Sequence, residues 1–228
     1  MAAVPPAAQE SGGVVVSAHV DFPVCLRLRG KRVLLVGAGN IAEERSQQLV
    51  DAGAVLRVVA PAAGPAIRRL AEEGRLELAE RPYAAGDVRG YHVVFVATDD
   101  RRVSEAVADE ARALGIWVNA ADIPELCDFT LPSVGRRGPI VVAVSTSGHA
   151  PALARRLRQQ FVEQVAPGHV QLARLTGWLR KRLPAGAERM RLLKQLVEGE
   201  AGELLTRGER KAAWVRVRAA LETFGEKQ

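Results

Sequence analysis

The chain has 228 residues, of which 48% are hydrophobic and 25% are charged, and it carries a formal net charge of +6. This composition is enough for one or two domains with a sizeable core and excludes a chain that is disordered throughout. No apolar run approaches the roughly 20 residues that cross a bilayer, and the cysteines stand alone, so we expect a soluble, cytoplasmic protein without a disulfide framework.

The most informative segment is an apolar strand, residues 33–36, that runs into glycines and then into a helical pattern over residues 41–52. Gly37 permits a tight turn, Gly39 lets the backbone approach a pyrophosphate, and Ala42 lets the helix lie close to the sheet. The N–H groups at the start of the helix are then available to the phosphates. The pattern predicts a dinucleotide-binding turn.

Strands and helices continue to alternate after this turn, which indicates a parallel sheet with helices on both faces. The pattern predicts strands over residues 55–59, 76–79, 91–98 and 116–120, and helices over residues 65–73 and 103–114. Two further apolar segments flank Gly135–Gly138 and predict a β-hairpin. Helical patterns follow from Pro151 onward. We therefore predict an α/β fold in which a Rossmann-type parallel sheet precedes a hairpin and a C-terminal helical module.

The cofactor pocket is expected to be lined mainly by backbone atoms. The second strand ends without the Asp or Glu that usually binds the ribose of NAD, and no Arg follows it to receive a 2′-phosphate, so we favour NAD over NADP. Thr98 and Asp99 follow another strand at the edge where open α/β sheets bind ligands, with a helix cap as the alternative. The other residues expected to line the pocket are Asn40, Ile41, Pro61 and Ala62.

Asp122 ranks first among the candidate catalytic residues, because it follows a predicted strand at the same edge of the sheet as the cofactor turn. Burial beside Ile123 and Pro124 would raise its affinity for a proton and suit it to act as an acid or a base. The alternative is a turn residue that precedes a proline.

A run of small polar residues precedes the first helix of the C-terminal module. Ser145, Thr146, Ser147 and Gly148 together form a helix start that can receive an anion, although each hydroxyl alone is better explained as an N-cap. His149 lies in the same loop, and a structural histidine is its alternative. Because no His or Cys spacing supports a preformed metal cage, we assign no metal ligands.

Charge is distributed unevenly along the chain. Residues 1–150 carry 16 Lys and Arg against 18 Asp and Glu, whereas residues 151–228 carry 16 against 8. A basic helical region of this kind fits a solvated face, a nucleic-acid surface or a binding site for a small molecule with many carboxylates. Charge alone does not choose among them.

Taken together, these segments resemble the precorrin-2 dehydrogenase and sirohydrochlorin ferrochelatase family, which forms the N-terminal half of siroheme synthases. The resemblance covers about residues 22–183, and the absence of an acidic residue after the second strand is also like this family. It rests on Phe22–Leu26, Val33–Ala42, Val58–Pro61, Ala97–Asp100, Asn119–Asp122, Phe129–Ser133 and Val142–Gly148.

The resemblance implies NAD-dependent oxidation of precorrin-2 to sirohydrochlorin, with ferrous iron inserted into the product by some members. It assigns Asp122 to both reactions and implies that Asn119 and residues 145–149 lie at the substrate. Thr146 stands where the bifunctional synthase can carry a phosphorylated serine, and His149 stands where small or basic residues are more usual. Precorrin-2 and sirohydrochlorin are thus the expected ligands, and their carboxylate arms give the basic helices a partner.

The resemblance also implies an intertwined homodimer and a division of the chain into segments. We expect a flexible tail at 1–18, an NAD-binding domain at 19–115, a dimerisation region at 116–149 and a helical domain at 150–228. The tail contains no Lys or Arg and lacks signal-peptide features. No methyltransferase domain follows the helices, so we expect another protein to methylate the precursor.

Two other functions remain open from the residues alone. One is an NAD-dependent dehydrogenase for a different small molecule, although no Tyr-x-x-x-Lys spacing supports it. The other is an NAD-binding redox sensor whose basic C-terminal half contacts DNA, although that half has only scattered basic residues with Trp178 and Trp214. We therefore expect neither nucleic acid nor a membrane as a partner.

Overall fold

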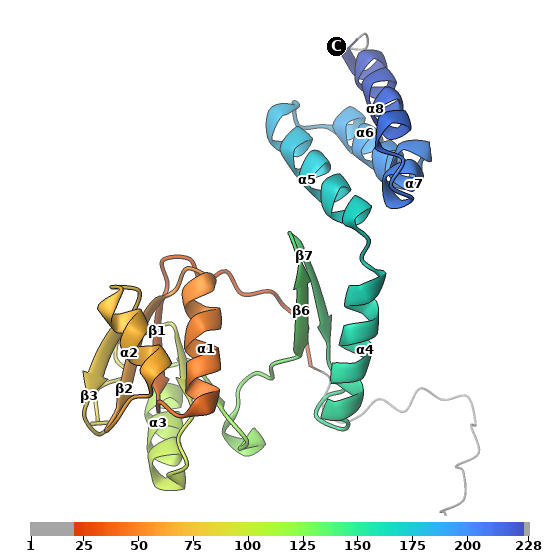
Figure 1. The fold of residues 1–228 in the computed structure, drawn as a ribbon. Coiled ribbons are helices and arrows are strands. Elements are labelled where there is room, and N and C mark those ends of the chain that lie inside the picture. The colour runs from red at the N-terminus through yellow and green to blue at the C-terminus, as the bar shows by residue number, and fades with distance from the viewer. Residues whose placement is uncertain (1–20, 226–228) are drawn as a thin grey trace, which may run out of the picture. The chain divides into compact units, whose positions relative to one another are not determined.

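The protein is described by a computed structural model over residues 21–225, which form two compact units that divide between Thr130 and Leu131. The first unit holds a parallel sheet, and the second holds a β-hairpin and the C-terminal helices (Figure 1). This arrangement confirms the predicted fold class. The tail expected over residues 1–18 lies outside the described residues, and the finer division of the chain into segments stays a prediction.

The first unit is a five-stranded parallel sheet with the strand order β3-β2-β1-β4-β5. The strands are β1 (Arg32–Val36), β2 (Val55–Ala60), β3 (Glu77–Glu80), β4 (Val93–Val96) and β5 (Trp117–Ala120), and the helices are α1 (Asn40–Asp51), α2 (Pro65–Glu72), α3 (Arg101–Ala113) and the short 3₁₀ helix η1 (Pro124–Leu126). The order reverses between β1 and β4, which makes their carboxyl ends the point where such sheets bind dinucleotides. The strand β5, which sequence analysis predicts as part of this sheet and also counts in the dimerisation region, is an edge strand of it.

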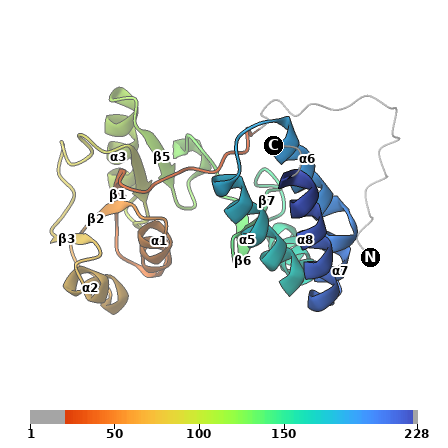
Figure 2. The same ribbon diagram turned by 90° about the horizontal axis from the view of Figure 1, so that it is seen from above.

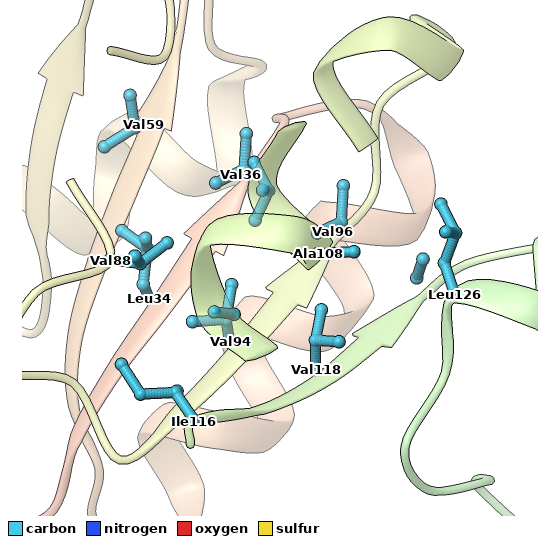
Figure 3. Packing of buried hydrophobic residues seen from close by; sticks show 13 residues of the cluster. Leu34, Val36, Val59, Val88, Val94, Val96, Ala108, Ile116, Val118 and Leu126 are labelled. Atoms are coloured by element: carbon cyan, nitrogen blue, oxygen red, sulfur yellow. The ribbon is translucent and has the colours of Figure 1, made fainter. Parts of the chain in front are cut away.

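Helices α1 and α2 cover one face of the sheet, and α3 covers the other (Figure 2). On the α3 side, Leu34, Val94 and Val118 from neighbouring strands lie with Ala108 of α3 in one cluster (Figure 3). Each fully buried aliphatic side chain of this size contributes roughly 1.5–3 kcal/mol to folding. Leu126 of η1 belongs to the same cluster, so the loop after β5 is anchored in the core.

Two of the differences between the predicted and the observed element boundaries are informative. The strand expected over residues 91–98 is limited to β4, because Ala97 already belongs to the loop that meets the cofactor turn. The hairpin consists of β6 (Ser133–Arg137) and β7 (Ile140–Val144), so its turn lies at Gly138 and Pro139 rather than at Gly135–Gly138. Gly135 instead pairs with Val142 inside the hairpin.

The second unit places α4 (Pro151–Gln164) against one face of the hairpin. A side chain at Gly135 would meet Val162 and Arg158 of α4, since its Cβ would lie 2.4 Å from Val162 Cγ2 and 2.7 Å from Arg158 Cδ. The glycine in mid-strand therefore serves the close packing of this helix. The remaining helices pack on one another and are α5 (Pro167–Arg182), α6 (Ala187–Glu198), α7 (Glu200–Thr206) and α8 (Arg210–Gly225).

None of the helices in the described part of the chain is both long enough and apolar enough to cross a membrane.

Candidate cofactor and substrate site

Gly37 follows β1 and packs against Ala97, the residue after β4, at the point where the strand order reverses. Its φ is +106°, a left-handed conformation that favours glycine, and a Cβ atom there would lie 2.0 Å from the carbonyl oxygen of Ala97. The residue is therefore fixed as glycine by the packing of the two loops themselves. This is the tight turn that the sequence predicts.

Gly39 differs from Gly37, because nothing in the described part of the protein requires it to lack a side chain. It is the N-cap of α1 with φ −78° and ψ −171°, a conformation open to any residue, and a Cβ atom there would have no described neighbour within 4 Å. Among residues 21–225, no side chain caps the N-terminus of α1. The turn thus combines open space with uncapped N–H groups, which is what a pyrophosphate needs, so the residues present fit a dinucleotide cofactor.

Of the first residues of α1, one is buried against the sheet and two are exposed to solvent. Ala42 is fully buried against the sheet, as expected for the third position of the glycine motif. Asn40 is exposed, and so is Ile41, with 47% of its surface accessible. An isoleucine this exposed at a helix start contributes little to the core of the unit, so it is available as an apolar contact for a bound ligand.

The loop after β2 is held in place by carboxylates that sequence analysis did not single out. Pro61 and Ala62 are exposed there, and their contact with the cofactor stays a prediction. Glu43 of α1 accepts a hydrogen bond at 3.2 Å from the backbone N–H of Ala66, near the start of α2. Glu80 accepts at 3.2 Å from the N–H of Ala63, which fixes the other side of the loop.

Arg68 of α2 lies close to this loop in sequence and uses two of its five donors within the protein. It donates to the carbonyl of Ala63 at 3.0 Å and to Glu80 at 2.7 Å. This pairing fixes the loop, and the preference for NAD over NADP stays a prediction.

Two aspartates follow β4, and they have different roles: Asp100 caps a helix, and Asp99 is exposed. Asp100 caps α3 by accepting from the backbone N–H groups of Arg102 and Val103, and Thr98 accepts from the N–H of Asp100 at 3.3 Å. The helix-cap alternative therefore holds for Asp100. Asp99 is exposed and makes no hydrogen bond within the described residues, so its assignment to the cofactor stays a prediction.

Asp122 occupies a left-handed turn directly after β5, with φ +60°. Residues other than glycine adopt this conformation at a cost of about 1–3 kcal/mol, and such strain is found most often at functional sites. The burial expected beside Ile123 and Pro124 is wrong: Asp122 is exposed, because the turn directs it away from the core into which Leu126 points. Its carboxylate is thus accessible at the carboxyl edge of the sheet, which is the location that sequence analysis predicts.

Asn119 of β5 has a role within the protein. Its amide group donates a hydrogen bond at 2.9 Å to the carbonyl of Phe129 and lies 3.6 Å from the sulfur of Cys127. These contacts hold the loop after β5 against its own strand. A contact between Asn119 and substrate stays a prediction.

Residues 145–149 belong to the second unit and are described within it. Thr146 accepts from the backbone N–H of Ala150 at 3.1 Å through its hydroxyl, and its carbonyl lies 3.0 Å from Nδ1 of His149. Ser147 has a left-handed φ of +48°, and Gly148 follows at +80°. The loop is therefore tightly folded, with Ser145, Ser147 and His149 exposed. Their contact with a substrate stays a prediction.

No cluster of three or more His, Cys, Asp or Glu side chains suited to a metal ion is present in residues 21–225. Burial raises the pKa of the Cys127 thiol, so this cysteine stays protonated near neutral pH. Sequence analysis missed Cys127, Glu43 and Glu80 as residues that shape the site. The contacts of Glu43 and Glu80 join parts of the chain that are 23 and 17 residues apart, and those of Cys127 depend on how the loop after β5 folds back, so no local motif predicts them.

Comparison with known proteins agrees with this geometry. Residues 24–133 match a family described as "Putative NAD(P)-binding", and residues 137–164 match one described as "Sirohaem biosynthesis protein central". Siroheme synthase of Methylococcus capsulatus is 40% identical over 191 residues, which are 82% of this chain and 40% of that protein. Siroheme synthase of Psychrobacter arcticus is 33% identical over 205 residues, or 88% of this chain and 37% of that protein.

The chain thus spans about 40% of the length of the curated relatives that it matches. Among solved structures, "SirC, precorrin-2 dehydrogenase" has the same fold, with a TM-score of 0.71 and 24% sequence identity over 90% of this chain and 99% of that one. These matches confirm the family that the sequence motifs indicate. The chain belongs to the family of the siroheme synthase N-terminal region.

Proposed function

We propose that this protein oxidises precorrin-2 to sirohydrochlorin with NAD as the hydride acceptor. One observation carries the proposal: a cofactor turn with room for a pyrophosphate at Gly39 shares the carboxyl edge of one sheet with the exposed, left-handed Asp122. Oxidation by hydride removal needs both a nucleotide and a group that takes a proton. The family membership supplies the substrate class.

Different residues bind the cofactor and transfer the proton in this scheme. NAD accepts the hydride when it is bound. The uncapped N-terminus of α1 would hold the pyrophosphate, and Gly39 would leave room for it. Asp122 takes the proton that leaves the tetrapyrrole, so that precorrin-2 and NAD⁺ yield sirohydrochlorin, NADH and one proton. Asp99 and Thr98 complete the rim of the cofactor pocket.

Iron insertion is a second activity that the same carboxylate can support. Some relatives of this kind insert ferrous iron into sirohydrochlorin, and insertion requires that pyrrole protons be removed. Asp122 is suited to this step because it is exposed and carries an ionisable carboxylate. Ferrous iron is here a substrate, which enters the macrocycle and not a cage of protein ligands.

The substrate also explains the basic second half of the chain. Precorrin-2 carries carboxylate arms around its rim, and residues 151–228 contain 16 Lys and Arg against 8 Asp and Glu. Residues 145–149 and Asn119 are the proposed contacts to the macrocycle. We also propose that the protein is a homodimer, with the exposed face of the β6–β7 hairpin as part of the interface.

Replacing Asp122 with Asn tests this function, because the amide keeps the size of the side chain but cannot take a proton. We expect Asp122→Asn to lower kcat for precorrin-2 oxidation by roughly 10² or more, with the NAD affinity unchanged. Chelatase activity, where present, falls in parallel. Asp109→Asn is the matched control, since Asp109 is an exposed aspartate on α3. An Asp122→Asn variant with nearly normal kcat would make Asp122 a turn residue and no more.

A further inference from the structure

The turn that carries Asp122 is weakly closed by its own backbone. It runs from Ala120, the last residue of β5, to Ile123, and Asp122 is its third residue. The N–H of Ile123 donates to the carbonyl of Ala120 at 3.4 Å, which is long for a hydrogen bond between backbone groups. The left-handed conformation of Asp122 therefore needs support from outside the turn.

The thiol of Cys127 contacts both ends of this turn. Its sulfur lies 3.1 Å from the carbonyl oxygen of Ala120 and 3.4 Å from that of Ile123, so the S–H group donates to one of them at a time. The N–H of Ala120 donates to the same sulfur at 3.3 Å. Because β5 is an edge strand of the described sheet, no neighbouring strand receives this N–H, and the sulfur takes that place.

Cys127 is itself held by the loop around it. Its backbone N–H donates to the carbonyl of Pro124 at 3.0 Å, and the preceding residue, Leu126, is buried in the core. The following residue, Asp128, accepts at 2.9 Å from the N–H of Val118 through its carboxylate. These contacts fix the position of the sulfur, which in turn contacts both ends of the turn.

We propose that Cys127 is a positioning residue for Asp122: its thiol ties Ala120 to Ile123 and so holds the intervening turn in the geometry that presents the carboxylate. The inference rests on the proposed function, since it assigns Asp122 the proton transfer. Cys127 itself touches neither the substrate nor the cofactor in this scheme. Its raised pKa fits the role, because only the protonated thiol donates a hydrogen bond.

Two substitutions separate the hydrogen bonds of Cys127 from its volume. Cys127→Ala removes the donor and acceptor, and we expect kcat for precorrin-2 oxidation to fall by about 10-fold, since small displacements of a catalytic group can cost up to 10² in rate. Cys127→Ser keeps a donor and acceptor of similar size, and we expect it to restore kcat to within about 3-fold of the wild-type value. The NAD affinity should not change in either variant.

A readout that does not depend on activity is the hydrogen exchange of the backbone amides of Ala120 and Ile123. Exchange at both should be faster in Cys127→Ala than in the wild type and in Cys127→Ser. In an Asp122→Asn background, Cys127→Ala should lower kcat no further, because the two residues act through one group. Cys25→Ala is the matched control, since Cys25 is exposed and has no role in this scheme.

The outcomes distinguish the two proposals. A wild-type protein that does not oxidise precorrin-2 would overturn the proposed function. An active wild type, with kcat and exchange at Ala120 and Ile123 unaffected by Cys127→Ala, would overturn the positioning role alone. That role is also overturned if Cys127→Ser is as impaired as Cys127→Ala, or if Cys127→Ala lowers kcat further in the Asp122→Asn background.

Discussion

The two sheets of this protein are covered to different extents. The parallel sheet has helices on both faces, and Val93–Val96 of β4 are buried at every position. The β6–β7 hairpin has α4 on one face, and on the other face Val134 and Val141 are 44% and 43% exposed. The first sheet has the coverage of a complete domain, whereas an isolated hairpin is at best marginally stable and normally requires another surface.

The register of the hairpin defines that open face. Val134 pairs with Ala143, and Arg136 pairs with Val141, so these four side chains lie on the same face, opposite α4. Three of the four are apolar. This face is therefore our candidate for the contact between two copies of the chain, so that one sheet would bind the cofactor and the other would serve association.

The largest effect on stability is expected from Gly37→Ala, because Gly37 lies in the parallel sheet unit where the strand order reverses between β1 and β4. The new Cβ atom would lie 2.0 Å from the carbonyl of Ala97, so either β1 or β4 must shift. We expect a loss of at least about 3 kcal/mol of unfolding free energy, since the clash adds to the left-handed strain. Gly74→Ala is the control, because Gly74 has φ +67° with no described atom within 4 Å. Urea denaturation of both variants measures the difference, and equal losses would exclude the clash.

The next effect in size is the loss of NAD binding by Gly39→Asp. A carboxylate at this position would occupy the space of the pyrophosphate and repel its charge. The described residues leave that space open, so the melting temperature should stay close to that of the wild type. Titration calorimetry should detect no NAD binding. Unchanged NAD affinity would remove the glycine turn from the cofactor site.

Charged side chains on the open face of the hairpin should weaken dimerisation without affecting NAD binding. We expect the double variant Val134→Asp and Val141→Asp to weaken dimerisation by about 10² or more, because buried, unpaired carboxylates are costly. NAD affinity should not change, since the parallel sheet is untouched. Sedimentation equilibrium measures the association. A variant that stays dimeric would exclude this face as the interface.

The smallest effect is expected from salt. If the basic residues after Pro151 attract the carboxylated substrate, KM for precorrin-2 should rise several-fold as the Debye length falls from about 30 Å at 0.01 M to about 8 Å at 0.15 M ionic strength. KM for NAD is the internal comparison and should change less. A KM for precorrin-2 that is independent of salt would leave the basic helices without a role in substrate capture.

The sequence predicts the parallel sheet better than the hairpin, for a physical reason. Strands buried on both faces leave continuous apolar runs, and the glycine turn has a fixed spacing around Gly37 and Gly39. The predicted hairpin turn begins too early in the chain, because Gly135 resembles a turn residue but is needed for the close approach of α4. Only tertiary packing reveals that use of glycine.

In the candidate site, too, sequence analysis predicts some features, whereas others depend on tertiary packing. The position of Asp122 at the edge of the sheet follows from the order of strands, and sequence analysis predicts it. Its exposure and its left-handed backbone do not, since both depend on how η1 folds back toward β5. The contacts of Cys127 with Ala120 and Ile123 likewise arise from that fold-back and leave no periodic pattern in the chain.

The most direct test is the anaerobic reaction of the wild-type protein with precorrin-2 and NAD, followed by absorbance. We expect NADH and sirohydrochlorin to appear together in equal amounts, and Gly39→Asp to form neither although it remains folded. Failure of the wild type to form NADH from precorrin-2, while it still binds NAD in calorimetry, would contradict the proposed function.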